Sequence, residues 1–315
     1  MTKTALLFPG QASQYVGMGR DLYDRFPTAR TMYVTASEIL GFDIARLSFE
    51  GPADVLVQTA NTQPAIFIHS CIAFQLAAER GLSFDVAAGH SLGEYSALVA
   101  CGVLSFEDGL VAVKHRARLM QEACEANPGT MAAVLGLDFD AVTAICRQAS
   151  ASGVVVAANY NAANQIAISG SLAGIKAAST LAAEAGAKRV IPLSVGGAFH
   201  SPLMRPSPER LAPILDGLSF RKAQQPVILN VTARPTLDPG EIKARLIDQL
   251  TAPVLWYPTM LCMRDMDVTR AIEFGPKKVL CGLAKGILTD AILESLDTVA
   301  DFESAWNHSA PAAQV

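Results

Sequence analysis

A serine set between two glycines is the strongest chemical signal in this chain. Residues 89–93 read Gly-His-Ser-Leu-Gly, which matches the pattern G-x-S-x-G. In this pattern a buried strand turns sharply into a helix, so that the serine hydroxyl is exposed at the turn and the amide of the next residue, Leu92, points at a developing oxyanion. An apolar run precedes the pattern and a helical pattern follows it. This context favours a nucleophilic Ser91 over an ordinary glycine-containing strand-to-helix turn, and the chemistry expected of it is acyl transfer.

A serine nucleophile needs a base at neutral pH, and histidine is the usual one. The chain has five histidines: His69, His90, His115, His200 and His308. His69 lies in an apolar helical stretch typical of a core, and His308 is in the C-terminal tail. His90 adjoins the serine on a sharp turn, where neighbouring side chains point in different directions. His115 precedes an arginine on a helix. His200 follows a predicted strand and a Gly-Gly loop, from which a base can reach the elbow. Elimination therefore favours His200.

Short apolar runs and long helical patterns must position these side chains. Runs such as Thr4–Phe8 and Asp85–Ala88 predict buried parallel strands, and the stretch Ala65–Ala78 between them predicts a buried helix. Further strands are expected at 226–231 and 271–274. Strands that alternate with long helices predict an α/β fold with a mostly parallel sheet flanked by helices.

The middle of the chain has a pattern of its own. Its segments follow the order strand, helix, strand, strand, helix, strand, which is that of a split ferredoxin-like unit. Loop signals bound it on both sides. We expect a small ferredoxin-like βαββαβ subdomain at residues 127–195, inserted into a large α/β catalytic subdomain of residues 1–126 and 196–315. Its six segments are expected at 131–137, 139–150, 154–158, 165–169, 173–185 and 188–193.

Composition and charge narrow the classes of function. Apolar residues make up 51% of the 315 residues and charged residues 17%, which suits a continuous core and excludes a disordered chain. The formal net charge of −4 argues against bulk electrostatic binding to nucleic acid or to an anionic membrane. The N-terminal apolar run is cut by Pro9 and Gly10, and no stretch has the ~18 charge-poor apolar residues of a membrane span. We expect a cytoplasmic protein with neither nucleic-acid nor membrane partners.

The cysteines give no sign of a metal site. They form no C-x-x-C pair and no Cys/His cluster of zinc-ligand spacing, so we expect reduced thiols, mostly in the core. The six are Cys71, Cys101, Cys124, Cys146, Cys262 and Cys281.

Five segments spread over nearly the whole chain carry a family resemblance. They are 8–14 (Phe-Pro-Gly-Gln-Ala-Ser-Gln), 62–65 (Thr-Gln-Pro-Ala), 89–95 (Gly-His-Ser-Leu-Gly-Glu-Tyr), 198–204 (Ala-Phe-His-Ser-Pro-Leu-Met) and 275–280 (Gly-Pro-Lys-Lys-Val-Leu). With them the chain resembles the malonyl-CoA:acyl carrier protein transacylases, which load malonyl groups for fatty-acid and polyketide synthesis. The resemblance implies a hydrolase-like core with a ferredoxin-like insertion. It also implies malonyl-CoA and an acyl carrier protein as partners, and no cofactor beyond the coenzyme A thioester that is the substrate.

The resemblance implies roles for single residues. Ser91 is expected to be the nucleophile and His200 its base. In this family a neutral carbonyl acceptor, rather than an aspartate, orients the histidine, and the matching position is Gln249. The amides of Gln11 and Leu92 are expected to form the oxyanion hole. The malonyl group would pass from coenzyme A to Ser91 and then to a phosphopantetheine thiol, in a ping-pong reaction.

Three further positions concern the acyl group. Arg116 matches the family arginine that grips the malonyl carboxylate, since a planar guanidinium binds a carboxylate in a bidentate fork and loses that partner with an uncharged acyl group. Judged by its neighbours Lys114 and Arg118 alone, Arg116 has the pattern of a solvated helix position. Gln63, in the second segment, and Phe199, typical of the malonyl-type version of the fourth, are expected to bind substrate.

Two positions depart from the family pattern. Ala12 and Lys277 stand where glycine is usual. Ala12 places a methyl group near the expected oxyanion amide. Lys277 and its neighbour Lys278 either contribute to a basic patch for the phosphates of coenzyme A or an acidic carrier protein, or are solvated turn residues.

Three alternatives remain at this point. A thioesterase or lipase shares G-x-S-x-G, but usually has an acid between serine and histidine in the chain to hold the base. Here the acids of that interval, such as Asp138, Asp140 and Glu184, fall on predicted helices or in the insertion, which weighs against hydrolysis. A free-standing acyltransferase of a polyketide synthase has the same chemistry in another pathway. A non-catalytic docking subunit is disfavoured by the intact serine, histidine and arginine.

Overall fold

The computed structural model describes residues 2–307, which are organised by two sheets. The six-stranded sheet has the order β10-β9-β1-β2-β7-β8, and the four-stranded sheet has the order β4-β5-β3-β6. The strands of the first sheet are β1 (Thr4–Phe8), β2 (Val86–Gly89), β7 (Val227–Ile228), β8 (Pro235–Thr236), β9 (Arg270–Phe274) and β10 (Ile292–Leu296). Those of the second are β3 (Gly129–Leu135), β4 (Val155–Ala162), β5 (Gln165–Ser171) and β6 (Arg189–Pro192).

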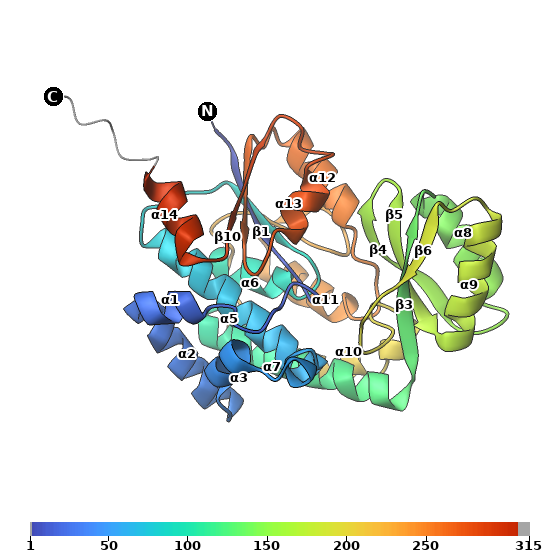
Figure 1. Cartoon of the computed structure of the whole chain (residues 1–315), viewed down its shortest axis with the longest axis horizontal. Helices are drawn as coiled ribbons and strands as arrows, with labels where there is room; N and C mark the ends of the chain where they lie inside the picture. Colours follow the sequence, from blue (N-terminus) through green and yellow to red (C-terminus); the bar gives the residue numbers. More distant parts are fainter. Residues whose placement is uncertain (1, 308–315) are drawn as a thin grey trace.

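Helices cover both faces of the six-stranded sheet, and helices lie on one side of the four-stranded sheet (Figure 1). Two of them, α8 (Phe139–Ala149) and α9 (Leu172–Glu184), pack on the four-stranded sheet. The others are α1 (Arg20–Arg25), α2 (Pro27–Leu40), α3 (Ile44–Glu50), α4 (Ala53–Leu56), α5 (Thr59–Ala78), α6 (Gly93–Ala100), α7 (Phe106–Ala126), the 3₁₀ turn η1 (Pro202–Met204), α10 (Ser207–Asp216), α11 (Pro239–Asp248), α12 (Trp256–Asp265), α13 (Val279–Ala284) and α14 (Val299–Asn307).

The central strands of the six-stranded sheet are buried on both faces. Every pairing from β10 to β7 is parallel, and β8 alone in this sheet runs antiparallel to its neighbour β7. In β1, Leu6 and Phe8 pack into the cluster formed with α5, α6 and α7, while Ala5 and Leu7 pack against α12 and α13. A strand buried on both faces has no polar positions, which explains the uninterrupted apolar run of β1. The expected α/β fold with a mostly parallel sheet is confirmed.

The four-stranded sheet has its own core and is antiparallel throughout. Its elements follow the order β3, α8, β4, β5, α9, β6. Figure 1 shows this unit beside the six-stranded sheet, with α8 and α9 on its outer side. A ladder joins the two units, because the amide of Tyr160 donates to the carbonyl of Val254 over 2.9 Å and the amide of Val254 donates to the carbonyl of Ala158 over 2.8 Å. The second unit therefore contacts the segment that precedes α12.

Some expectations differ from the structure in detail. The strand expected at 226–231 is two residues long, because the chain after Ile228 leaves the sheet and Asn230 turns its side chain to the strand-to-helix turn at Gly89. The edge strands β8 and β10 were not foreseen; β10 is partly exposed and lacks a continuous apolar run. The C-terminal tail, with His308, lies outside the described residues. No helix of the described part of the chain is long and apolar enough to cross a membrane.

Candidate active site

Ser91 lies at the turn between β2 and α6 and has the backbone strain expected of such an elbow, with φ of 52°. The two glycines of the motif allow three backbone segments to meet there. A Cβ atom on Gly93 would lie 1.9 Å from the carbonyl oxygen of Phe8, and one on Gly89 would lie 1.9 Å from the backbone of Gly93. Both positions therefore require glycine. The close packing holds the turn that carries Ser91 against Phe8, the last residue of β1.

His200 faces the serine. Its Nε2 atom lies 2.8 Å from Oγ of Ser91, and its Nδ1 atom lies 2.8 Å from the main-chain carbonyl oxygen of Gln249. A carbonyl oxygen only accepts hydrogen bonds, so Nδ1 carries the proton and Nε2 is left as the acceptor for the serine hydroxyl. The two ring nitrogens thus have a hydroxyl and a main-chain carbonyl as partners, and within residues 2–307 neither is hydrogen-bonded to a carboxylate.

The surroundings of His200 keep its ring neutral. Its side chain is buried, and burial lowers its pKa from the usual 6.5 to about 3, with the positive charge of Arg116 acting in the same direction. A neutral imidazole is the form that accepts a proton. The ring is therefore ready to act as a base over the whole neutral range.

Arg116 is fully buried, and its guanidinium touches the nucleophile. Its Nη2 atom donates to Oγ of Ser91 over 3.0 Å and to the side-chain oxygen of Gln249 over 2.8 Å, and its Nη1 atom donates to the side-chain oxygen of Gln63 over 2.6 Å. The buried Nε atom makes no hydrogen bond of good geometry to the described residues. The solvated position that its basic neighbours indicated is wrong for Arg116, because this residue lies on the inner face of α7. Arg118, by contrast, is exposed and pairs with Glu122.

Two residues are expected to form the oxyanion hole. Leu92 follows Ser91 in the chain, and Gln11 lies in the loop after β1. Neither the amide of Gln11 nor that of Leu92 donates a hydrogen bond within residues 2–307. The side chain of Gln11 accepts from Nε2 of Gln63 over 3.0 Å, and Gln63 in turn holds Arg116. Both amides are thus without an acceptor in the described part of the chain, and Gln63 ties the loop of Gln11 to the arginine.

Phe199 differs from the other expected residues in that it makes no polar contact. Its side chain is 5% exposed and packs in the large core cluster next to His200. The structure thus places it as an apolar support of the segment that carries the base.

Two residues of the site were missed by sequence reasoning. Asn230 accepts a hydrogen bond from the amide of Ser91 over 2.7 Å and donates to the carbonyl of Gly89 over 2.7 Å, so it clamps the elbow. Glu94, which is completely buried, accepts from Nε2 of Gln249 over 2.8 Å and from the amide of Asn230 over 3.2 Å. The sequence could have indicated Glu94, because it lies within the motif segment 89–95. Asn230 lies in none of the five motif segments, so no sequence pattern indicated it.

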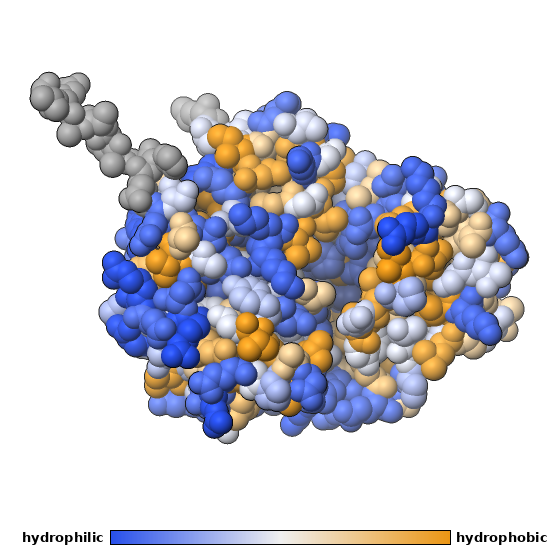
Figure 2. All heavy atoms as spheres, in the orientation of Figure 1, coloured by the Kyte–Doolittle hydropathy of each residue, from blue (hydrophilic) through white to orange (hydrophobic). Residues whose placement is uncertain are grey.

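His90 joins the elbow to the second unit. Its Nε2 atom lies 2.8 Å from the side-chain oxygen of Asn161 in β4, and its ring packs against Trp256, with ring centres 5.5 Å apart. Figure 2 shows a hollow between the two units of the molecule. The turn that carries Ser91 therefore contacts the second unit through His90.

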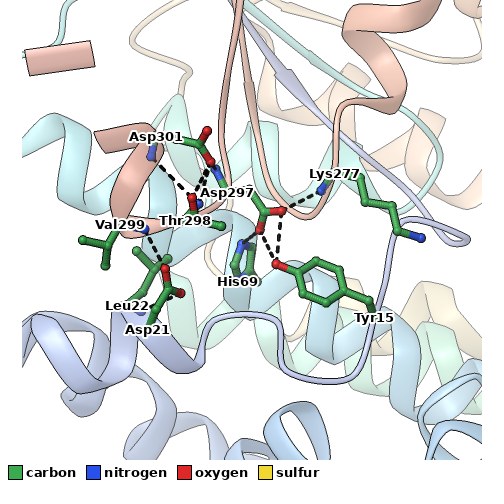
Figure 3. A network of polar contacts seen from close by, with 9 residues as sticks. All are labelled: Tyr15, Asp21, Leu22, His69, Lys277, Asp297, Thr298, Val299 and Asp301. Atoms are coloured by element: carbon green, nitrogen blue, oxygen red, sulfur yellow. Dashed lines mark hydrogen bonds and ion pairs between the residues drawn. The ribbon is translucent and has the colours of Figure 1, made fainter. Parts of the chain in front are cut away.

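A second polar cluster fastens the loop that carries Gln11, at the end away from the serine (Figure 3). The carboxylate of Asp297 accepts from the hydroxyl of Tyr15 at 3.1 Å and from the amide of Lys277 at 2.9 Å, and it lies 2.9 Å from Nε2 of the buried His69. His69 is thus a core residue, as expected, and Asp297 is its partner. Although burial opposes ionisation of Asp297, His69 and these donors hold the pKa of its carboxyl below the usual value.

The cysteines and potential metal ligands can be placed as well. All six thiols are unpaired, and Cys71, Cys101 and Cys146 are buried. Among residues 2–307 no group of three or more His, Cys, Asp or Glu side chains is arranged to hold a metal ion.

Comparison with known proteins places this site in a family. Residues 5–286 match the model of the acyl transferase domain. The malonyl CoA-acyl carrier protein transacylase of Bacillus subtilis (strain 168) is 45% identical over 288 residues, 91% of each chain. The crystal structure of an acyl carrier protein S-malonyltransferase from Vibrio cholerae is 40% identical, with a TM-score of 0.93 over 96% of this chain and all of that one. A malonyl-transacylase solved in complex with its type II PKS acyl carrier protein is 35% identical, with a TM-score of 0.93 over 98% of this chain and all of that one.

Proposed function

The chain belongs to the acyl transferase domain family, and on this basis we propose that it transfers the malonyl group from malonyl-CoA to the phosphopantetheine thiol of an acyl carrier protein. The observation that carries the proposal is the arrangement at Ser91, whose hydroxyl contacts both a neutral histidine and a buried arginine. The first contact supplies a nucleophile and the second supplies a cation for a carboxylate-bearing acyl group.

The first half-reaction forms an ester on Ser91. Nε2 of His200 takes the hydroxyl proton as Oγ attacks the thioester carbonyl, and the amides of Gln11 and Leu92 stabilise the oxyanion. The carbon–sulfur bond then breaks, and His200 returns the proton to the departing coenzyme A thiolate. Throughout, the carbonyl of Gln249 holds the Nδ1 proton and stabilises the imidazolium while it lasts.

The second half-reaction reverses these steps with a different thiol. His200 takes the proton of the phosphopantetheine thiol, the thiolate attacks the malonyl ester, and Ser91 recovers its proton as it leaves. The atoms and charges balance with the residues of the chain, so we propose that no metal or redox cofactor takes part and that the coenzyme A thioester is the substrate.

Selectivity for malonyl follows from the burial of Arg116. The free carboxylate of a malonyl group bound to Ser91 would accept from the Nη2 and Nε atoms of Arg116, and this Nε makes no hydrogen bond of good geometry within residues 2–307. Gln63 would hold the guanidinium in place through Nη1, and Gln249 would hold it through the second hydrogen of Nη2. An acetyl group would leave this cation buried without the carboxylate, which is unfavourable.

We also propose a division of the chain and a location. Residues 127–195 form a ferredoxin-like subdomain inserted into a hydrolase-like catalytic subdomain of residues 1–126 and 196–315, which is supported by the separate core and the strand order β4-β5-β3-β6. The cytoplasmic location is supported by the unpaired thiols, which suit a reducing compartment.

Two alternatives share this site. Service to a polyketide synthase has one observation in its favour, the similar malonyl-transacylase solved with a type II PKS carrier protein; we favour fatty-acid synthesis because the relatives with the higher identities carry the general transacylase name. An editing hydrolase is disfavoured, because His200 is held by a main-chain carbonyl rather than by the acid usual in hydrolases.

The test is to incubate the protein with malonyl-CoA and to measure the mass of the intact chain, then to add a phosphopantetheinylated carrier protein. We expect one malonyl adduct, absent from Ser91→Ala, and its transfer to the carrier thiol. Absence of the adduct in the native protein would rule out the mechanism, and release of free malonate in place of transfer would establish the hydrolase.

A further inference from the structure

Glu94 is a buried carboxyl group for which the catalytic steps above have no use. It lies on α6, three residues after the nucleophile, and is completely buried. Its Oε2 atom accepts from Gln249 and Asn230, while its Oε1 atom is buried without a hydrogen-bond partner among residues 2–307. A buried carboxylate oxygen without a donor is costly, so its position calls for a reason.

The side-chain amide of Gln249 connects Glu94 to Arg116. Its oxygen accepts from Nη2 of Arg116 over 2.8 Å, and its nitrogen donates to Oε2 of Glu94 over 2.8 Å. The amide dipole is thus aligned between a cation and a carboxyl group. The same nitrogen also donates to the carbonyl of Ser91 over 3.0 Å, so this relay passes directly beside the nucleophile.

The charges of the site change when the acyl group arrives. In the empty site, ionised Glu94 balances the charge of Arg116 through Gln249. A malonyl group brings a second carboxylate to the same cation, which leaves one excess negative charge in a buried site. A proton on Glu94 removes that excess and turns its unpartnered oxygen into a hydroxyl.

We propose that Glu94 is the counter-ion of Arg116 in the empty site and takes up a proton from solvent when a carboxylate-bearing acyl group binds. Recognition of malonyl is then coupled to protonation of Glu94, whereas acetyl binding is not. The inference rests on the proposed malonyl transfer and adds the residue that adjusts the charge of its acyl pocket.

The electrostatic surroundings of Glu94 support this role. Burial raises the pKa of Glu94 to about 7, although Gln249, Asn230 and Arg116 oppose the shift, so that both of its forms are accessible near neutral pH. The titratable groups around it do not change charge in that range. Burial lowers the pKa of the Arg116 guanidinium on α7, but Tyr95 and Glu94 oppose this shift and an arginine stays charged at neutral pH. Burial raises the pKa of Tyr95 and lowers the pKa values of His200 and His90.

The first experiment compares the native protein with Glu94→Gln, which keeps an oxygen acceptor for both donors. Loading of Ser91 from malonyl-CoA and from acetyl-CoA is measured in single turnovers between about pH 6 and pH 8.5. The ratio of the two rates is compared, because both substrates carry the same phosphates and any effect of phosphate titration on the rates cancels in the ratio. In the native protein we expect the malonyl-to-acetyl ratio to fall above pH 7, approaching tenfold per pH unit. In Glu94→Gln we expect it to be independent of pH.

A merely structural role would give a different result, because it would lower both rates together and leave the pH dependence of their ratio unchanged. That outcome, or a flat ratio in the native protein, overturns the proposal. If the native protein loads no malonyl at any pH, the proposed function itself fails, which is a separate outcome.

The second experiment measures the proton directly and does not depend on the folding of Glu94→Gln. Malonyl-CoA is titrated calorimetrically into Ser91→Ala at pH 7 in two buffers with different ionisation enthalpies, and acetyl-CoA serves as the control. We expect uptake of about half a proton with malonyl-CoA and none with acetyl-CoA. Equal uptake with the two substrates would contradict the coupling.

Discussion

The Nη2 atom of Arg116 donates a hydrogen bond to Oγ of Ser91 across 3.0 Å, so the buried cation of the site touches the nucleophile itself. An acyl group on Ser91 must therefore form next to this guanidinium. The contact links two parts of the proposed function, because the residue proposed to select the acyl group also lies against the oxygen proposed to carry it.

Replacement of Arg116 by alanine tests this selection. We expect Arg116→Ala to lower kcat/KM for malonyl loading roughly 100-fold, equivalent to about 3 kcal/mol for a lost charged hydrogen bond, and to spare or raise acetyl loading. The measurement is a panel of acyl-CoAs assayed for loading. Arg118→Ala, on the exposed side of the same helix, is the matched control and should leave the selectivity unchanged. Equal losses for malonyl and acetyl in Arg116→Ala would remove the proposed role.

The pKa of His200 predicts how the reaction depends on acid. Because burial and Arg116 lower its pKa to about 3, the ring stays neutral well below its usual 6.5. Single-turnover malonyl loading should therefore show no loss between about pH 6.5 and pH 5. An acid limb centred near pH 6.5 would show instead that the histidine has its ordinary pKa.

The free energy of unfolding, unlike the loading rate, should fall as the pH is lowered from 7 to 5. The unfolded chain binds a proton at His200 below about pH 6.5, which the folded chain does not take up until about pH 3. The neutral histidine thus costs no stability above pH 6.5 and an increasing amount as the pH falls through that window. In urea unfolding at pH 7 and pH 5, the native protein should lose more free energy of unfolding than His200→Gln does.

Two residues with left-handed backbone conformation are positions where glycine should increase the stability of the protein. Ala12 and Lys277 have φ of 76° and 68°, at the positions where the family usually has glycine, and Nζ of Lys277 lies 3.5 Å from the carbonyl oxygen of Ala12. A left-handed alanine costs about 1 kcal/mol, so Ala12→Gly should raise the free energy of unfolding by up to that amount, and Lys277→Gly should act in the same direction.

Thermal or urea unfolding checks these two variants. Ala144→Gly, at an exposed position in the interior of α8, is a control of opposite sign, because glycine within a helix costs about 1 kcal/mol. A loss of stability in Ala12→Gly comparable to that of the control would mean that the loop is not strained at this residue.

Asp297 predicts a link between the cluster of Figure 3 and catalysis. Asp297→Ala removes the shared partner of Tyr15, Lys277 and the buried His69, so we expect a loss of about 2–3 kcal/mol of stability. Because Tyr15 anchors the loop that carries Gln11, the rate of Ser91 acylation should fall as well, with little change in KM.

Urea unfolding and single-turnover loading measure the two effects. Asp24→Ala, which removes an exposed ion pair with Arg20, should change stability by less than about 0.5 kcal/mol and leave acylation intact. An Asp297→Ala protein with reduced stability but a normal acylation rate would show that the cluster holds the fold without positioning the loop.

The sequence by itself determined the features that depend on neighbours in the chain. The apolar run of β1, the glycines of the elbow and the helices that follow are local patterns, and the structure has them where they were expected. Ser91 could be proposed as a nucleophile because its motif is five residues long, and His200 as its base because the other histidines had local reasons to be excluded; the structure brings these two side chains together.

Tertiary structure decided what depends on distant residues. The burial of Arg116 was hidden by its basic neighbours, since the helix face that a residue occupies depends on what packs against it. Glu94 and Gln249 are 155 residues apart, and Asn230 and Ser91 are 139 apart. Such contacts leave no local pattern, because they form when folded elements meet. The proposed nucleophile was therefore visible in the sequence, whereas the charged groups that surround it became visible in the fold.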